Sequence, residues 1–335
     1  MIQGDKSPAS YSMETEVADM HTYLGLDFGG TKLLIGEVDE NGKILNSKRY
    51  TTGLSNQEDA VSRILQSLQD YKENVGFAGE IQAAGLGIVG IVNHTRGEWV
   101  AMQHEISGPP IPIVRLLEEQ LSVPCAVDND VRSATTAEWM LGQGKHSQDF
   151  IYLNVGTGLA AGFVTGGHII RGASHNAGEI GHMVVDLKSE DSCICGRLGC
   201  AENAVSGAGF TYQTKKYGLT QFLNEIGRAD VPALFEKAQA GDQSCMKIVE
   251  YAADTLACVI MNLVRFTDPD TFIIGGGIVS NEWFLGKVKE RLHPETMRGV
   301  TGGIVLSSFD PRYAGLMGAA SLGMHLIRNG KEEKL

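Results

Sequence analysis

The chain has 335 residues, more than one hydrophobic core usually serves, and its 43% hydrophobic and 20% charged residues are ordinary for a folded globular protein. The formal net charge of −12 argues against a surface that binds nucleic acids or acidic membranes. No run of about 18 apolar residues is present, so we expect a cytoplasmic protein that has neither a nucleic-acid nor a membrane partner.

Residues 1–22 are polar and lack the basic end and the apolar core of a secretion signal. We expect them to form a disordered N-terminal extension. The segment is too short to hold a winged DNA-binding domain ahead of the first strand.

The next part of the chain alternates short apolar runs with a helical pattern. In chain order the sequence predicts strands at 23–28, 33–38 and 43–50, a helix at 56–71, a strand at 81–89, a helix at 112–121, a strand at 123–127 and a helix at 131–141. The helix at 56–71, for example, places Ala60, Ile64 and Leu68 at helical spacing.

The second half opens as the first does, with strands at 150–155 and 160–165 around a glycine turn, and continues with a helix at 244–266, a strand at 271–274 and a helix at 314–327. Because both halves begin with a strand, a Gly-Thr turn and a strand, we expect a duplicated α/β fold with a cleft between two domains. The small domain would span residues 23–130, completed by a C-terminal helix at 314–328, and the large domain residues 131–313.

Glycine-rich turns at two strand ends, 29–32 and 156–158, are suited to phosphate binding, and a third at 275–277 would let a base or ribose lie against bare backbone. Glycines let backbone N–H groups approach phosphate oxygens, and a threonine hydroxyl and a lysine can add donors. Asp27, at the first strand end, could hold water on Mg²⁺. Ordinary tight turns are the alternative. The candidate ATP- or phosphate-binding residues are Asp27, Gly29, Gly30, Thr31, Lys32, Gly156, Thr157, Gly158, Gly275, Gly276 and Gly277.

Three polar residues, Asp128, Asn129 and Asp130, follow the strand predicted at 123–127. A carboxylate at this point could accept a proton from a substrate hydroxyl that Asn129 orients. N-capping of the helix beginning at Val131 would also explain these residues. The residues alone leave both interpretations open.

A cluster of three cysteines and a histidine predicts a structural zinc site. The ligands are His182, Cys193, Cys195 and Cys200, whereas Cys125, Cys245 and Cys258 stand alone in apolar surroundings. Four protein ligands leave no open coordination position, so the zinc should shape a loop and not activate water. Glu179 and Glu202 flank the cluster and could accept hydrogen bonds from sugar hydroxyls, although they could equally be solvated surface charges.

These motifs together resemble the ROK family of sugar kinases and related repressors. The resemblance extends from about residue 23 to about residue 327 and depends on LGLDFGGTK, VDNDVRSATTAE, VGTGLAAGF, GEIGH, CICGRLGC and IIGGG. The combination of GEIGH with the cysteine motif is the most specific part.

The resemblance implies an actin-like ATPase (ribonuclease H-like) fold whose two domains close on ATP·Mg²⁺ and a hexose or amino-hexose. It also implies that Asp130 is the general base, that Asn129, Glu179, His182 and Glu202 hold sugar hydroxyls, and that the protein is a homodimer. Polyphosphate in place of ATP stays open.

One departure concerns sugar specificity. Many relatives carry an Asn-Leu-x-Gly-Trp pattern where residues 101–110 here read AMQHEISGPP, so a preference for glucose does not carry over. Three alternatives to a kinase are a transcriptional regulator of the same family without a DNA-binding domain, a non-catalytic sugar sensor, and an actin-like or chaperone-type ATPase without a small-molecule acceptor. The intact Asp130 favours the enzyme over the sensor, and the zinc cluster favours a sugar kinase over the general ATPase.

Overall fold

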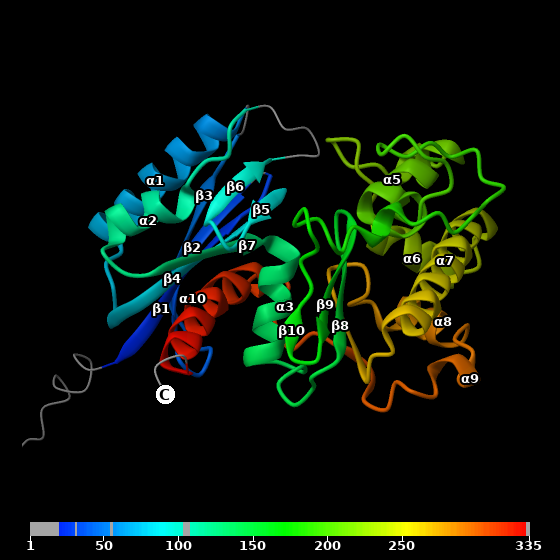
Figure 1. The fold of residues 1–335 in the computed structure, drawn as a ribbon. Coiled ribbons are helices and arrows are strands. Elements are labelled where there is room, and N and C mark those ends of the chain that lie inside the picture. The colour runs from blue at the N-terminus through cyan, green and yellow to red at the C-terminus, as the bar shows by residue number, and fades with distance from the viewer. Residues whose placement is uncertain (1–19, 31, 54–55, 103–107, 333–335) are drawn as a thin grey trace, which may run out of the picture.

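Two five-stranded sheets form the framework of the chain (Figure 1). The computed structural model describes residues 20–30, 32–53, 56–102 and 108–332. Thr31 and residues 1–19 of the expected N-terminal extension therefore lie outside the described residues. No helix in these ranges has the length and apolar character needed to cross a bilayer.

The first sheet has the order β3-β2-β1-β4-β7. Its strands are β1 (His21–Phe28), β2 (Lys32–Asp39), β3 (Ile44–Thr51), β4 (Glu80–Ile88) and β7 (Cys125–Asn129). Strand β1 pairs antiparallel with β2 and parallel with β4, which pairs parallel with β7. The register aligns Asp27 with Gly87 and Gly87 with Asp128, so the polar ends of β1 and β7 lie at one edge of the sheet.

The second sheet repeats this arrangement in the order β10-β9-β8-β11-β12. Its strands are β8 (Phe150–Val155), β9 (Leu159–Thr165), β10 (His168–Ile169), β11 (Thr271–Gly275) and β12 (Gly303–Leu306). Strand β8 pairs antiparallel with β9 and parallel with β11, which pairs parallel with β12. The duplication that the two Gly-Thr turns predicted is thus present in the strand order of both sheets.

Alternating side chains give each sheet two buried faces. On one face of the first sheet, Leu24, Leu26 and Phe28 pack against α1 (Gln57–Asn74), and α2 (Ile113–Leu121) covers the same side. On the other face, Leu34 and Val38 pack against α3 (Asp130–Met140) and α10 (Ala314–Glu332). Figure 1 shows α3 and α10 on the side of the first sheet that faces the second.

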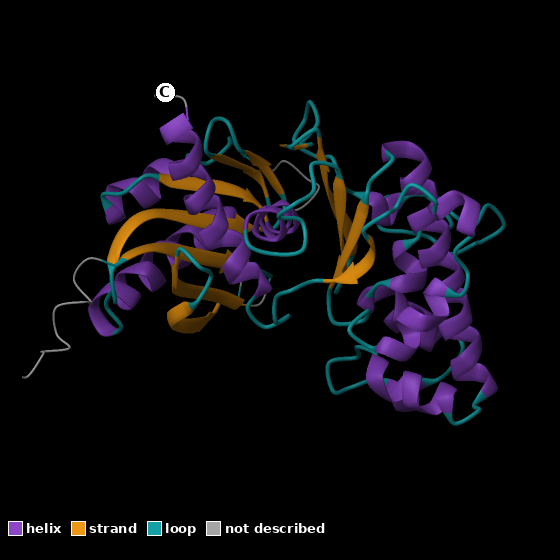
Figure 2. Ribbon diagram, turned by 90° about the horizontal axis from the view of Figure 1, so that it is seen from below, coloured by secondary structure: helices purple, strands orange, loops and turns teal. Residues whose placement is uncertain are grey.

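Helices of the second half cover the outer face of the second sheet (Figures 1 and 2). They are α4 (Glu202–Val205), α5 (Gly207–Lys216), α6 (Val231–Gln239), α7 (Gln243–Thr267), α8 (Glu282–Lys289) and α9 (Pro294–Met297). Ile151 and Leu153 face this helical layer, whereas Phe150 and Tyr152 face Val131 on α3. Asp242 begins α7 by accepting hydrogen bonds from two backbone N–H groups of its first turn.

The C-terminal helix α10 lies directly on β1 and β4. Glycines in the strands permit this contact, because a Cβ placed on Gly85 would lie 1.9 Å from the carbonyl oxygen of Ala319. The last helix is therefore part of the layer beside the first sheet, although it follows all strands of the second sheet along the chain.

Every strand and helix predicted from the sequence is present, with small shifts at its ends. The short hairpin of β5 (Ile91–Asn93) and β6 (Glu98–Ala101), the edge strands β10 and β12, and the shorter helices of the second half were not predicted. The four unpredicted strands have only two to four residues each, and so short a segment carries too little hydrophobic periodicity to distinguish a strand from a turn.

A buried ion cluster joins the two sheets at the end of β7. Asp128 is fully buried, and its carboxylate accepts hydrogen bonds from Arg132 Nε at 2.7 Å and Arg171 Nε at 2.9 Å. Arg132 belongs to α3, whereas Arg171 follows β10 of the second sheet. Arg132 Nη1 also donates to the carbonyl oxygen of Ala177 at 3.3 Å. Burial alone would raise the pKa of Asp128, but the two guanidiniums outweigh it and hold the pKa below its usual range.

We expect Asp128→Asn to destabilise the protein by about 3–5 kcal/mol, because it leaves two guanidiniums facing a neutral group in a buried site. The midpoint of urea unfolding at neutral pH measures the effect. The control is Glu119→Gln, which removes an exposed ion pair with Arg115. It should leave the midpoint unchanged. Equal midpoints for both variants would show that the buried cluster contributes nothing to stability.

Candidate functional site

The end of β7 and the start of α3 form the wall of a pocket of about 420 Å³. Asn129 caps α3, since its Oδ1 accepts the Val131 N–H at 3.0 Å while its Nδ2 donates to the Gly90 carbonyl at 3.2 Å. Asp130 Oδ1 accepts the same Val131 N–H at 3.0 Å. The helix capping that the sequence offered as an alternative role is therefore present, with Asn129 as the cap residue. It involves only the Oδ1 atom of Asp130, whose side chain also lines the pocket.

The residues predicted to contact a sugar come together in this pocket. Asn129, Asp130, Glu179, His182 and Glu202 all line it, although they come from both halves of the chain. Glu202 Oε2 accepts the backbone N–H of Leu159 at 3.0 Å, which fixes that carboxylate at the pocket floor. Glu179 precedes the 3-10 turn η1 (Ile180–His182) and is exposed. The polar lining can accept and donate several hydrogen bonds to a polyhydroxylated ligand.

A second pocket of about 290 Å³ adjoins the first and contains most of the predicted phosphate-binding residues. Its lining includes Asp27 and Lys32 from the first half, together with Gly156, Thr157, Gly276 and Gly277 from the second half. Asp130, Val131 and Asn154 line both pockets. Asp130 therefore stands where a group in one pocket can meet a group in the other.

The remaining predicted phosphate residues are placed differently. Gly158 lines the first pocket, and Gly275 lines a smaller cavity of about 110 Å³ that shares Tyr152 and Gly276 with the second pocket. Gly29 and Gly30 form the turn after β1 but are not among the lining residues of these pockets, and Thr31 lies outside the described residues. At Gly276 the backbone has φ +102°, and a Cβ would lie 2.3 Å from the Val155 carbonyl oxygen. Glycine is required there.

The two aspartates of the second pocket have raised pKa values. Burial, followed by the negative charge of Asp27, raises the pKa of Asp130 to about 6. Burial also raises the pKa of Asp27, despite the opposing charges of Lys32 and Arg49. A carboxylate with a pKa of about 6 is largely ionised at neutral pH and is still basic enough to accept a proton.

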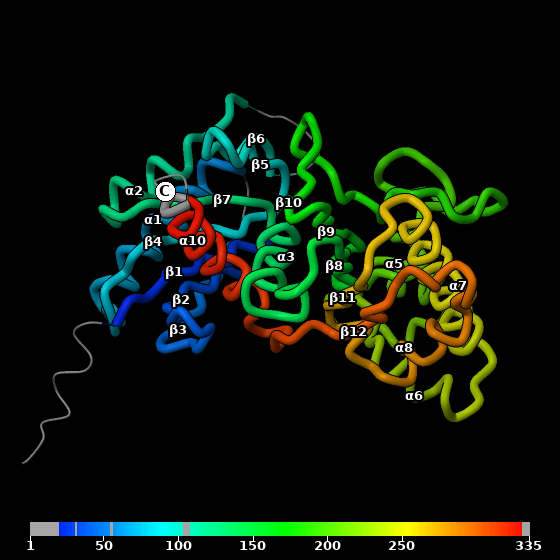
Figure 3. The backbone as a smooth tube through the Cα atoms, turned by 60° about the horizontal axis from the view of Figure 1, so that its bottom comes forward, coloured from blue at the N-terminus to red at the C-terminus, as the bar shows by residue number. Residues whose placement is uncertain are grey.

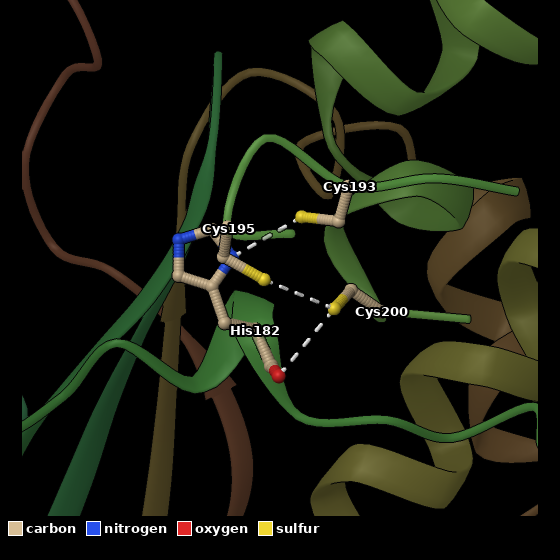
Figure 4. A group of neighbouring side chains, drawn as sticks. All are labelled: His182, Cys193, Cys195 and Cys200. Atoms are coloured by element: carbon tan, nitrogen blue, oxygen red, sulfur yellow. Dashed lines mark hydrogen bonds between the residues drawn. The ribbon is translucent and has the colours of Figure 1, made fainter. Parts of the chain in front are cut away.

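His182, Cys193, Cys195 and Cys200 converge beside the first pocket (Figure 4). Their ligand atoms all lie within 4.8 Å of one another, with 3.4 Å between Cys193 Sγ and His182 Nδ1 and 3.6 Å between the sulfurs of Cys195 and Cys200. Tetrahedral zinc, at about 2.3 Å from sulfur and about 2.0 Å from nitrogen, separates its ligand atoms by roughly 3.5–3.8 Å. The donor set and its spacing therefore fit a four-coordinate metal ion.

Several lining residues of the first pocket were not assigned a role from the sequence. Asn154 is the next-to-last residue of β8 and pairs in register with Gly275, as Asp27 near the end of β1 pairs with Gly87. This equivalence between the two sheets could have identified Asn154 from the sequence. Met102 belongs to the segment 101–110 that the sequence linked to sugar specificity, whereas Asn176 lies in a loop and Ile194 supplies apolar surface with no local pattern that distinguishes it from other loop residues.

Comparisons with known proteins agree with this architecture. The N-acetylmannosamine kinase of Escherichia coli (strain 55989 / EAEC) is 29% identical over 307 residues, which are 90% of this chain and 98% of that protein. The solved ROK hexokinase from Thermus thermophilus has 27% identity and a TM-score of 0.74, covering 92% of this chain and 99% of its own. A solved ROK family glucokinase from Streptomyces griseus, in complex with glucose and AMPPNP, has 26% identity and a TM-score of 0.72, covering 91% and 99%.

The predicted fold class, an actin-like ATPase fold with two α/β domains, is confirmed by these structures. The model of the ROK family matches residues 23–325, nearly the whole chain. The chain therefore belongs to the ROK family.

Proposed function

We propose that this protein is a sugar kinase that transfers the γ-phosphate of ATP to a hydroxyl of a hexose or amino-hexose, with Asp130 as general base. The observation that carries this proposal is the position of Asp130 on the wall shared by the two pockets. A sugar hydroxyl in the first pocket and a phosphate in the second would meet at this carboxylate. Phosphoryl transfer depends chiefly on such positioning and on charge neutralisation.

The first pocket suits the acceptor sugar. Asn129, Glu179, His182 and Glu202 present amide, carboxylate and imidazole groups to its hydroxyls. The apolar side chains of Ile91, Met102 and Ile194 border the same space and suit an N-acetyl methyl group as well as a sugar ring face. The similarity to N-acetylmannosamine kinases supports including N-acetylated hexosamines among the acceptors.

The second pocket suits the triphosphate. Lys32 supplies a positive charge, and the turn at Gly156–Gly158 supplies backbone N–H groups and a threonine hydroxyl. Asp27 places a carboxylate in this cavity, the kind of oxygen ligand that Mg²⁺ and its bound water prefer. Bound Mg²⁺ would neutralise phosphate charge, while Asp130 holds the proton released by the sugar. The glycines 275–277 leave bare backbone against which the nucleoside could lie.

The domains would close on these two substrates and exclude water, which otherwise competes with the sugar as acceptor. In this proposal residues 23–130 with the helix at 314–328 form the small domain, and residues 131–313 form the large one. Zinc bound by His182 and the three cysteines would hold the loop between η1 and α4, which carries Glu179 at one end and Glu202 at the other.

A coupled ADP-release assay against hexoses, amino-hexoses and N-acetylhexosamines tests the function. We expect sugar-dependent ADP release, which Asp130→Asn lowers by roughly 10²–10⁴-fold while sugar binding persists. The matched control is Asp230→Asn at the start of α6, where asparagine caps the helix equally well. Release of ADP without sugar would identify a general ATPase, and sugar binding without any ADP release would identify a sensor.

The activity should depend on pH through Asp130. Because the base must be deprotonated, we expect kcat/KM for the sugar to rise with pH to a plateau, with an apparent pKa of about 6 on the acidic side. Below this pKa, protonation of the raised carboxyl should lower kcat/KM about tenfold per pH unit. The acidic limb is measured by plotting kcat/KM for the sugar against pH at saturating ATP. An acidic limb near the ordinary aspartate pKa of about 4 would contradict this environment for Asp130.

Elemental analysis should find about one zinc per chain. Cys200→Ser should lower the zinc content and weaken sugar binding, because the loop between Glu179 and Glu202 loses its constraint. Cys258→Ser, at an isolated cysteine on α7, is the control and should keep both. A metal-free protein with unaltered sugar affinity would refute the structural role of zinc.

A further inference from the structure

A further cavity of about 520 Å³ is lined by residues of α10, α3 and β10, and it shares no lining residue with the pockets described above. Figure 3 shows where these three elements lie in the backbone. The cavity is lined by His94, Ala126, Trp139, Gly167, His168, Ile169, Arg171, Leu322, His325, Leu326 and Asn329. Trp139 is nine residues beyond Asp130 on α3, about 13 Å along the helix axis. The cavity is therefore separate from the proposed substrate site.

Among the residues whose side chains are described, the lining is basic and contains no carboxylate, although the protein carries a net charge of −12. One arginine and three histidines face the space, together with the amide of Asn329 and the ring of Trp139. Burial, followed by the charge of Arg171, lowers the pKa of His94. The permanent positive charge of the cavity therefore resides on Arg171.

Arg171 has donors to spare. Its Nε donates to Asp128 at 2.9 Å and its Nη1 to the carbonyl of Ile169 at 3.5 Å, whereas its Nη2 makes no hydrogen bond to any described residue. Asp128 also neutralises Arg132, so two guanidiniums share one carboxylate. Asp128 therefore neutralises Arg171 only in part.

We propose that this cavity is a second binding site, specific for a phosphate group, either free or on a small ester. Arg171 would bind the phosphate through its free donors, and His168, His325 and Asn329 surround the same space. Asn329 Nδ2 already lies 2.9 Å from His325 Nε2, and the His325 ring lies 5.5 Å from that of Trp139. These contacts hold the α10 side of the cavity in place without a ligand.

Isothermal titration calorimetry of the whole chain with inorganic phosphate and, separately, glucose 6-phosphate tests the site. We expect binding to weaken about tenfold or more in His168→Ala and in the double variant His325→Ala/Asn329→Ala. Lys32→Ala, which alters the proposed ATP pocket, should keep this binding. His293→Ala removes an exposed histidine outside the cavity and serves as the matched control.

The outcomes separate this site from the proposed kinase site. Phosphate binding that is lost in Lys32→Ala and kept in both cavity variants would overturn the proposal, as would no binding of either ligand. Weakening in His168→Ala with an unchanged circular dichroism spectrum supports it even if the double variant does not fold. Binding of the ester but not of free phosphate, or the reverse, identifies the form that the cavity takes.

Discussion

Asp128 remains ionised although it is fully buried, because two arginine side chains donate hydrogen bonds to its carboxylate. This interaction ties together segments that are distant along the chain: the end of β7, the first turn of α3 and the loop after β10. Asn129 and Asp130 follow directly, so their positions depend on this ion cluster. An uncharged side chain at 128 would leave the two sheets without their buried ionic link at the wall of the candidate site.

The wall that the two pockets share, formed by Asp130, Val131 and Asn154, explains why one chain needs two similar sheets. In the first sheet, the strand ends supply Asp27 and Asp130, and in the second sheet Asn154 and the glycines 275–277. Neither sheet alone encloses a pocket with carboxylates on one side and glycine turns on the other. The duplicated strand order brings both sets of ends to one cleft, in agreement with the general position of ligand sites at the carboxyl ends of strands.

Sequence patterns predicted the regular elements and the local motifs well, for physical reasons. Strands such as β1 and β8 bury both faces and appear as continuous apolar runs, and the cysteine cluster is local, so its spacing already determines that the ligands meet. The Asp128–Arg171 ion pair and the position of Asn176 in the first pocket could not be predicted, because they depend on packing between segments of different sheets. Gly29 and Gly30 show the reverse case: a motif that fits phosphate binding but whose glycines do not line the pocket.

The ion cluster also constrains how the two halves can move. Arg132 donates to the Ala177 carbonyl two residues before Glu179, and Arg171 holds the preceding part of the same loop to Asp128. The segment that carries Glu179 is therefore fastened to α3 beside Asp130. Any closing movement of the two halves would therefore have to pivot at this point, where the buried ion cluster joins both sheets beside Asp130.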